Sequence, residues 1–388
     1  MKEISFAFDF VRNGVSVKQD SKANGVPITR IETIANETID YKRVGFANIN
    51  FDTLGKYENY LLKDGDILMS HINSPTHLGK TALYKNIPKD LIHGMNLLCL
   101  RPNISVCNSD YINYYFKTKY FKNSLNKIWN QSVNQASFSV TNLKKLKIPL
   151  PDLDTQKRIA QILDDAAGLR DKTKQLIAEY DQLEQSIFLD MFGDPVTNPK
   201  GWKKVIFTKL FEQGKKSIKP ENIKNGQKYI GLEHIEKETG KILEIVELKK
   251  NEIKSNKFWF DKNYVLYGKL RPYLNKVATP YFEGVCSTDI IPFKAISGKS
   301  NKLFLSNLLR GRWFVNYANE RVSGANLPRI SPKEVNKFLT INPPIDLQNQ
   351  FAEQVALIEQ QKKLAKHGLK ESESLFNCLL QKAFKGEL

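Results

Sequence analysis

The chain contains an internal repeat at one constant offset. Residues of the segment from about Phe138 to Asp194 return 192 positions later without a gap, so that Pro151, Asp154, Gln156, Ala160, Lys174, Glu179, Leu183 and Phe192 are matched by Pro343, Asp346, Gln348, Ala352, Lys366, Glu371, Leu375 and Phe384. Two helices of similar composition would not by chance keep one offset along their whole length. An internal repeat is therefore a stronger guide to the architecture than any local motif. We therefore expect two copies of one unit, each a globular part followed by a long helix, related by an approximate two-fold axis.

Both long segments show the heptad periodicity of coiled-coil helices. Their apolar residues recur in steps of three and four, and we expect these to pair the helices: Ile159, Ile162, Leu169, Leu176, Leu183 and Ile187 in the first segment, and Phe351, Val355, Ile358, Leu369, Phe376 and Leu379 in the second. The second segment has polar interruptions at Lys362 and Ser372. Helices related by a two-fold axis perpendicular to the pair must run antiparallel, which predicts globular parts at opposite ends of a rod.

Helix start and stop signals predict the domain boundaries. Prolines precede both helices, and Gly193 followed by Pro195 ends the first one. Strand-like segments shared by the globular parts, such as Arg43–Ile49 and Tyr229–Ile235, predict a common fold with an insertion of about twelve residues in the second copy. The predicted fold class is α+β, with two similar α/β domains separated by two long antiparallel coiled-coil helices. The expected division is a globular domain at 1–150, a helix at 151–193, a second globular domain at 194–342 and a second helix at 343–388.

The composition is basic, with 59 Lys and Arg against 41 Asp and Glu and a net charge of +18. Such an excess favours a nucleic acid partner, the alternative being an unspecialised basic protein from a Lys-rich proteome. The four cysteines form no C-x-x-C pair, which favours a reducing compartment. Neither a secretory signal nor an apolar run of the ~20 residues that span a membrane is found, so we expect a cytoplasmic protein.

The motifs that could carry catalysis are incomplete. Asn342-Pro343-Pro344-Ile345 resembles the Asn-Pro-Pro-aromatic loop of amino-methyltransferases, but Ile345 cannot supply the stacking face. Glycine-rich cofactor loops and a P-loop are missing, and the five histidines show no metal-ligand spacing. Aromatic residues between Tyr111 and Phe121 recur at helical spacing and could stack on bases, but leucines in the second copy favour a core helix. The sequence therefore predicts a binding protein without a catalytic site.

Three segments resemble the conserved regions of the specificity subunit of type I restriction-modification systems, namely Pro149–Leu163, Gln185–Pro195 and Leu375–Leu388. With the duplication, the resemblance extends over the whole chain. It implies that each globular part is a target recognition domain for one half of a bipartite DNA sequence. The paired helices would be a spacer, whose length sets the unread base pairs between half-sites, and a docking surface for two modification subunits.

The resemblance also implies where the chemistry would lie. S-adenosylmethionine would be held by the modification subunits, which methylate adenine, and ATP and Mg²⁺ would serve partner subunits that include restriction subunits. This chain would then be a non-catalytic subunit with no cofactor or metal of its own. Two other readings stay open: a coiled-coil scaffold that joins proteins without reading DNA, and the specificity subunit of an orphan methyltransferase. A fused methyltransferase or nuclease is a third.

Loops are where base-reading side chains are expected. In the first domain the segments Ser70–Lys80 and Gln131–Ser137 are candidates, and in the second Lys269–Lys276 and Arg321–Arg329. The side chains that we expect to contact DNA are Ser70, His71, Asn73, Thr76, His77, Lys80 and Gln135 in the first domain, and Arg271, Tyr273, Asn275, Lys276, Arg321, Asn326 and Arg329 in the second. For each of them, a solvated side chain or a phosphate contact is the alternative to base readout.

Overall fold

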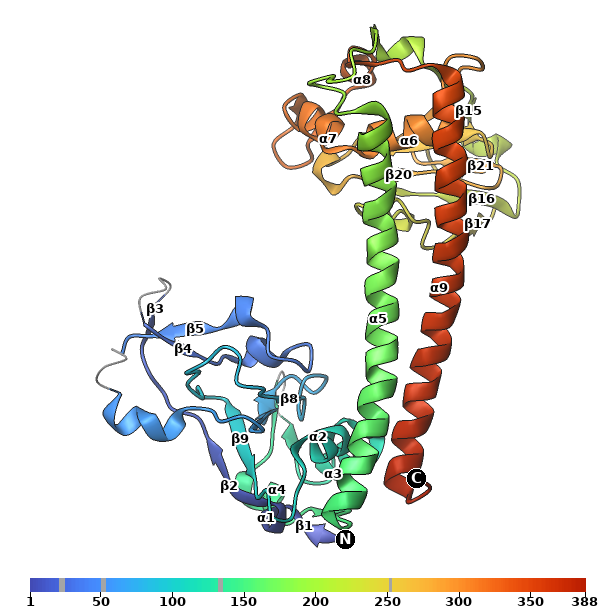
Figure 1. Cartoon of the computed structure of the whole chain (residues 1–388). Helices are drawn as coiled ribbons and strands as arrows, with labels where there is room; N and C mark the ends of the chain where they lie inside the picture. The colour runs from blue at the N-terminus through green and yellow to red at the C-terminus, as the bar shows by residue number, and fades with distance from the viewer. Residues whose placement is uncertain (21–24, 50–53, 132–134, 251–252) are drawn as a thin grey trace. The chain divides into compact units, whose positions relative to one another are not determined.

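The computed structural model describes residues 1–20, 25–49, 54–131, 135–250 and 253–388. The chain divides into two compact units, described here one by one: unit 1 comprises Met1–Lys172 and Leu369–Leu388, and unit 2 comprises Thr173–Gly368. Each of the long helices contributes to both units, since α5 spans Leu153–Phe192 and α9 spans Ile345–Lys385 (Figure 1). The predicted fold class, mixed α and β with two long antiparallel helices, is confirmed.

Unit 1 is built on an antiparallel sheet with the order β2-β9-β6-β8, formed by β2 (Phe8–Asn13), β9 (Leu97–Pro102), β6 (Ile67–Ser70) and β8 (Thr81–Leu83). Further strands pair as β1 (Lys2–Glu3) with β12 (Lys147–Ile148), as β3 (Gln19–Asp20)-β5 (Gly45–Ala47)-β4 (Val26–Ile28), and as β10 (Asn130–Gln131)-β11 (Ala136–Ser137)-β7 (Ile72–Asn73). Its shorter helices are α1 (Ile4–Ala7), η1 (Ile31–Ile34), η2 (Tyr41–Arg43), η4 (Gly55–Tyr60), α2 (Ser109–Lys117), α3 (Lys119–Leu125) and α4 (Val140–Lys144).

Unit 2 repeats this plan with the order β14-β22-β19-β20, formed by β14 (Phe211–Gln213), β22 (Ile290–Ala295), β19 (Tyr264–Gly268) and β20 (Val277–Ala278). A five-stranded sheet has the order β15 (Ser217–Ile218)-β18 (Lys257–Phe260)-β21 (Gly284–Cys286)-β16 (Gln227–Ile230)-β17 (Val246–Leu248), and the remaining pairs are β13 (Lys204–Ile206) with β25 (Leu339–Ile341) and β23 (Val322–Ser323) with β24 (Arg329–Ile330). The shorter helices are η5 (Phe207–Lys209), η6 (Pro220–Asn222), η7 (Leu232–His234), η8 (Pro272–Leu274), α6 (Lys302–Arg310), α7 (Arg312–Asn319) and α8 (Pro332–Asn336).

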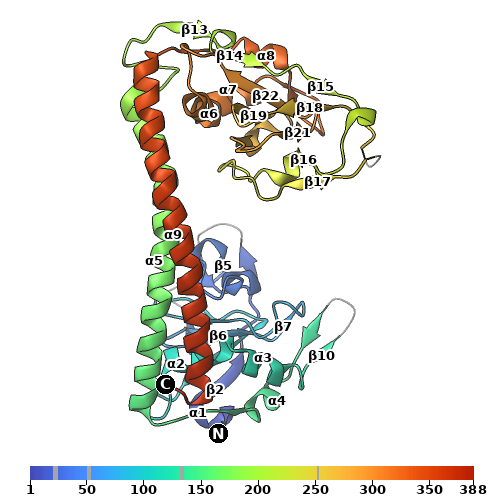
Figure 2. The same cartoon turned by 90° about the vertical axis from the view of Figure 1, so that its right-hand side faces the viewer.

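The central strands read as continuous apolar runs because both of their faces are covered. Along β6, Ile67 and Met69 join the core that includes α2, whereas Leu68 packs in a separate cluster. Strand β19 divides in the same way, with Val265 in the core that includes α6 and Leu266 in a second cluster. Figure 2 shows α6 between strands β19 and β22 and the long helices. The two units therefore share a fold down to the alternation of their central strands.

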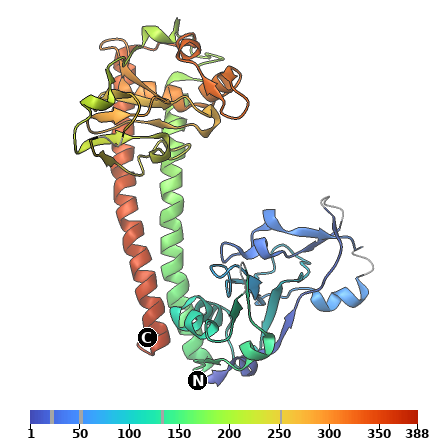
Figure 3. The same cartoon turned by 180° about the vertical axis from the view of Figure 1, so that it is seen from behind.

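Most aromatic residues near Tyr111 lie in the core, as predicted, but they belong to two helices, α2 and α3, and Tyr120 is exposed. Asn108 caps α2 by accepting a hydrogen bond from Tyr111 N at 2.9 Å. The rings of Tyr111 and Tyr115 lie 5.1 and 5.2 Å from that of Phe384 in α9, and Figure 3 shows this end of α9 beside the start of α5. In unit 2, Phe188 and Phe192 near the end of α5 contact Phe351 near the start of α9. The helices thus pair antiparallel in both units.

The candidate pairing residues differ in burial. Ile159, Phe351, Val355 and Ile358 are buried, and Ile162, Ile187, Leu369, Phe376 and Leu379 are half-buried. By contrast, Leu169, Leu176 and Leu183 are 53%, 41% and 43% exposed. The buried positions of α5 in the same stretch are instead Leu163, Ala166 and Glu184. The sequence pattern favoured leucines with polar interruptions at Lys362 and Ser372, and both of these residues are buried, as is Glu184.

Two charged residues in this seam are related by the repeat. Lys362 of α9 is 9% exposed and donates to Asp181 of α5 and, at 3.1 Å, to Glu359. Its counterpart 192 positions earlier is Arg170 in unit 1, whose guanidinium lies 4.8 Å from the ring centre of Phe376 in α9. The hydrogen bond with Asp171 is the main cause that raises the pKa of Arg170, and Glu373 of α9 adds to it. A polar group at a core position of paired helices specifies their register.

A buried glutamine lies in the first turn of each long helix, at matching positions of the repeat. Gln156 is 0% exposed; its Oε1 accepts from Asn108 N at 2.8 Å, and its Nε2 donates to the carbonyls of Val106 at 2.9 Å and Pro151 at 2.8 Å. In unit 2, Gln348 is also 0% exposed and makes the equivalent bonds with Asn301 N at 3.0 Å, Lys299 O at 3.2 Å and Pro343 O at 2.9 Å. Each glutamine therefore fastens a long helix to the loop before α2 or α6.

Candidate nucleic-acid interface

In unit 1 the two candidate segments lie together. The loop between β6 and β8 is closed by hydrogen bonds from Ser70 N to Lys80 O at 2.9 Å and from Gly79 N to Ser70 O at 2.8 Å. Within it, β7 pairs with β11, so that Asn73 stands opposite Ala136. This pairing brings Gln135 beside the loop, whereas residues 132–134 of the other candidate segment lie outside the described residues. Segments about sixty positions apart in sequence thus form one surface.

The side chains of this loop divide into a buried base and an outer surface. Ser70 and His71 are 1% and 6% exposed, so they belong to the core at the end of β6 and not to the DNA-facing surface that we expected. Burial lowers the pKa of His71, which a hydrogen bond with Asn96 backbone partly offsets, and the ring is neutral at physiological pH. Thr76 and Gln135 are exposed, and Asn73, His77 and Lys80 are half-exposed.

The loops of both units end in a lysine with the same role. Lys80 donates from Nζ to the carbonyl of Ala35, directly after η1, at 2.8 Å. Lys276 donates from Nζ to the carbonyl of Leu232, in η7, at 2.7 Å. Each ammonium group therefore ties its loop to a 3-10 helix of the same unit. Both lysines hold the loops in position, a role that sequence reasoning did not distinguish from DNA contact.

In unit 2 the candidate segments are also joined. Arg271 N donates to Pro328 O at 2.7 Å, Ile330 N donates to Lys269 O at 3.1 Å, and Leu270 forms a bridge with Arg329. The loop itself is η8 between two residues in left-handed conformation, Arg271 with φ 51° and Asn275 with φ 49°. This conformation costs a non-glycine residue roughly 1–2 kcal/mol. Arg271 is exposed, and so is Tyr273 at 51%.

The remaining candidates of unit 2 have protein partners to different degrees. Asn275 is only 7% exposed, so this predicted DNA contact is instead a buried support of the loop. Arg329 pairs with Asp289 through Nε at 3.0 Å, and this hydrogen bond raises the pKa of Arg329. Arg321 lies over the ring of Tyr317 and pairs with Glu320 at 3.0 Å. Asn326 is exposed.

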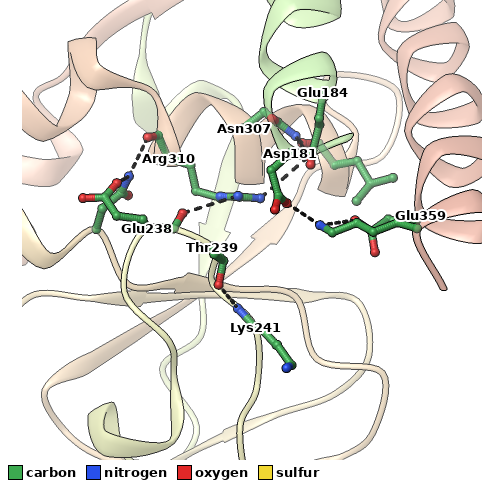
Figure 4. Close-up of polar contacts among 11 residues, drawn as sticks. Asp181, Glu184, Glu238, Thr239, Lys241, Asn307, Arg310 and Glu359 are labelled. Carbon is green, nitrogen blue, oxygen red and sulfur yellow. Dashed lines mark hydrogen bonds and ion pairs between the residues drawn. The ribbon is translucent and has the colours of Figure 1, made fainter. Parts of the chain in front are cut away.

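A polar network connects the loop of unit 2 to α5 (Figure 4). Glu184 of α5 is 6% exposed; it accepts from Asn307 Nδ2 at 2.8 Å and lies 3.7 Å from Arg310 Nη1. Arg310 in turn accepts at its carbonyl from Asn275 Nδ2 at 2.9 Å, and Asn275 Nδ2 also donates to Glu238 at 3.2 Å. Side chains far apart in the sequence thus fasten the loop to the long helix.

Unit 1 makes the equivalent connection with aromatic residues. Tyr114 of α2 stands where Asn307 stands in α6, and its ring lies 6.0 Å from that of Phe376 in α9. Its hydroxyl donates to Asp164 of α5 at 2.7 Å. The two loop-bearing domains are therefore held to the helices by different chemistry.

A cavity of about 510 Å³ adjoins the loop of unit 1. Asn73, His77 and Lys80 of the loop line it together with Gln19, Arg30, Glu32, Met95 and Asn96. Sequence reasoning missed Arg30 and Gln19 because they precede the loop by forty residues or more, and no local pattern places them beside it.

Two kinds of site are missing from the part of the chain that the structure describes. None of the helices there is both long enough and apolar enough to cross a membrane. Among the same residues, no group of three or more His, Cys, Asp or Glu side chains is placed to hold a metal ion.

Comparisons with known proteins agree with this geometry. Residues 8–181 match the family model of the type I restriction modification DNA specificity domain. A protein of Methanocaldococcus jannaschii assigned as the type I restriction enzyme MjaX specificity subunit is 39% identical over 205 residues, which cover 53% of this chain and 48% of that protein. The type I restriction enzyme EcoDI specificity subunit of Escherichia coli is 28% identical over 194 residues, which cover 49% of this chain and 43% of that protein. The chain thus spans about half the length of these relatives in the matched regions.

The fold also matches a solved structure. The S subunit of a type I restriction-modification system from M. genitalium aligns with a TM-score of 0.51 and 15% identity, covering 99% of this chain and 95% of that one. At this identity the likeness concerns the fold, and it extends over the whole chain. Together with the matched domain, these similarities agree with the resemblance drawn from the repeat: residues 8–181 match the DNA specificity domain of type I restriction modification, and the chain is similar to type I restriction enzyme specificity subunits.

Proposed function

We propose that this chain is the DNA-recognition subunit of a type I restriction-modification complex and reads a bipartite target with its two globular domains, at 1–150 and 194–342. The observation that carries the proposal is the duplicated loop assembly. In unit 1 the loop after β6 is joined to the segment that leads into α4, and in unit 2 the loop after β19 is joined to the segment that leads into α8. A chain that presents the same surface twice is suited to two half-sites.

The exposed and half-exposed side chains of these loops are the DNA contacts that we propose. They are Asn73, Thr76, His77 and Gln135 in unit 1, and Arg271, Tyr273 and Asn326 in unit 2. Arg321 and Arg329 each pair with a carboxylate, which occupies part of their donors, so we propose them as secondary contacts. Contacts to phosphate supply affinity that falls with salt, and contacts to base edges supply the sequence preference. The net charge of +18 supports binding through phosphate contacts.

The long helices, at 151–193 and 343–388, are the proposed docking surface for two modification subunits. In unit 2 they expose Leu176 and Leu183 of α5 by 41% and 43%, and Leu357 and Leu364 of α9 by 63% and 61%. Leucines that repeat on the outer face of a helix are typical of a surface that another protein covers. S-adenosylmethionine, ATP and Mg²⁺ would then belong to the partners, restriction subunits among them, and this chain would be non-catalytic and act in the cytoplasm.

The test is methylation mapping in cells that carry this chain with its modification subunit. We expect adenine methylation in one split sequence, and no such motif when the chain is omitted. A mobility-shift assay over a salt series from 50 mM distinguishes the scaffold alternative, which the exposed leucines alone would also suit. Low affinity that salt does not change would exclude DNA recognition.

A further inference from the structure

The cavity of unit 1 contains an arginine whose orientation is fixed from one side. Arg30 N donates to Thr33 Oγ1 at 2.8 Å, and Thr33 Oγ1 donates to the carbonyl of Arg43 at 2.9 Å, which anchors the start of η1. Arg30 Nε donates to Gln19 Oε1 at 2.6 Å. The Nε edge of the guanidinium is therefore occupied by Gln19, and this bond leaves the two terminal amino groups to make other contacts.

A glycine in β5 makes room for this pair. A Cβ atom at Gly45 would lie 2.5 Å from Arg30 Nε and 2.9 Å from Arg30 Cζ, and closer still to Gln19 Oε1. Side-chain carbon atoms essentially never approach polar atoms so closely, so any larger residue would displace the pair. The glycine, the glutamine and the arginine form one arrangement, and its effect is to hold a planar group at the rim of the cavity. The strands concerned, β3 and β5, are labelled in Figure 1.

A carboxylate accompanies the arginine. Glu32 Oε1 lies 3.7 Å from Arg30 Nη1, and the Glu32 side chain is 56% exposed. A carboxylate at this distance repels a phosphate group, so the site is poorly suited to the DNA backbone. A base pair fits better. Arginine donates two parallel hydrogen bonds to O6 and N7 of guanine, and a carboxylate accepts from the N4 amino group of cytosine.

We propose that Arg30, positioned by Gln19 and by the absence of a side chain at Gly45, reads the major-groove edge of a guanine in the half-site bound by unit 1, with Glu32 accepting from the paired cytosine. This inference rests on the proposed function, and it adds a specificity-determining residue outside the two loops. Its location is consistent with that role, because Asn73 and His77 of the loop line the same cavity.

Unit 2 lacks the equivalent arginine. The 3-10 helix η7 begins as η1 does, with a side chain three positions on that accepts from the backbone of the residue before the helix, here His234 Nδ1 from Gly231 N at 3.0 Å. Gly231 therefore stands where Arg30 stands in unit 1. The half-site read by unit 2 is accordingly an internal control for any change at Arg30.

The experiment maps methylation by the complete complex with its modification subunits, comparing the unchanged chain with Arg30→Ala, Arg30→Lys and Gly45→Ala. We expect both Arg30 variants to accept other base pairs at one guanine position of one half-site, with discrimination reduced on the order of tenfold to a hundredfold. Lysine keeps the charge but not the paired donors, so it should not restore discrimination. Gly45→Ala should weaken the same position, because the displaced groups are the ends of flexible side chains and the fold is retained.

The outcomes separate the inference from the proposed function. If the unchanged chain directs no split motif, the proposed function fails. If it does, but the Arg30 variants keep the same motif and lose affinity for all sequences with a salt slope shallower by about one, Arg30 is a phosphate contact and the inference is overturned. A half-site without guanine, or relaxation in both half-sites, would overturn it as well.

Discussion

Replacing Gln156 by leucine should destabilise unit 1 far more than an average substitution. Leucine has a similar size but leaves Asn108 N, Val106 O and Pro151 O without the side-chain partner that each now has. The side chain is fully buried, so water does not replace the lost bonds in the folded state. Each buried polar group left unpaired costs about 1–3 kcal/mol. Because effects of neighbouring groups are not additive, we expect a total of about 3–5 kcal/mol.

The assay must resolve the two units, since a chain with two compact units is not expected to unfold in one step. Hydrogen exchange in a urea series should show faster exchange in α2 and in the start of α5 for Gln156→Leu, whereas amides near Gln348 keep their protection. Gln161→Leu is the matched control: Gln161 is exposed on the same helix and donates to Asp165, one turn further on, at 2.9 Å, so its effect should stay within about 0.5 kcal/mol. A loss below about 1 kcal/mol for Gln156→Leu would refute the reasoning.

Three further predictions concern other parts of the structure. Asn275→Ala should increase hydrogen exchange in the loop of unit 2 and lower methylation through the second half-site only, and equal effects on both half-sites would contradict the positioning role. A double-mutant cycle with Lys362→Met and Asp181→Asn should give a coupling energy of about 1–3 kcal/mol, whereas a value near zero would show that the pair does not stabilise the helices. His93 is buried, and desolvation lowers its pKa from 6.5 to about 4. As the pH falls, His93 is protonated in the unfolded chain before it is protonated in the folded one. The free energy of unfolding of unit 1 should therefore fall between pH 6.5 and 4, by at most about 3 kcal/mol. A His93→Phe variant that keeps the same pH dependence in urea titrations would contradict this.

The long helices could be predicted closely because their signals are local. The expected ranges 151–193 and 343–388 compare with Leu153–Phe192 and Ile345–Lys385. Proline at the start and glycine at the end act through the backbone of their own turn, and Gly193 has the positive φ of 73° that such a helix end requires. Because the two copies keep a constant offset, the start and the end of one helix also indicate those of the other.

The sequence predicted which segments form the candidate sites, but not which of their side chains are exposed. The candidate segments were brought together in each unit, but sequence does not show which of their side chains turn inward. Ser70, His71 and Asn275 looked like readers because they are polar, and tertiary packing buries them. Arg30 was missed for the opposite reason: its partner Gln19 and the space at Gly45 come from other strands. Lys362 was recognised from the sequence as a polar interruption of the apolar pattern, whereas its partner Asp181 and the buried Glu184 were not.

The different connections of the two domains to the helices limit how freely such modules can be exchanged. Glu184 is buried and depends on the amide of Asn307, whereas the corresponding position in unit 1 is the phenol ring of Tyr114. A graft that moved the first domain into the second place would remove the amide donor of Asn307 and set against the buried Glu184 a larger ring, which in unit 1 packs on Phe376 and donates from its hydroxyl to Asp164. Recombinant chains of this fold should therefore take position 184 from the same parent as the domain that contacts it. The recombination point that preserves this contact lies within α5 and not at its end.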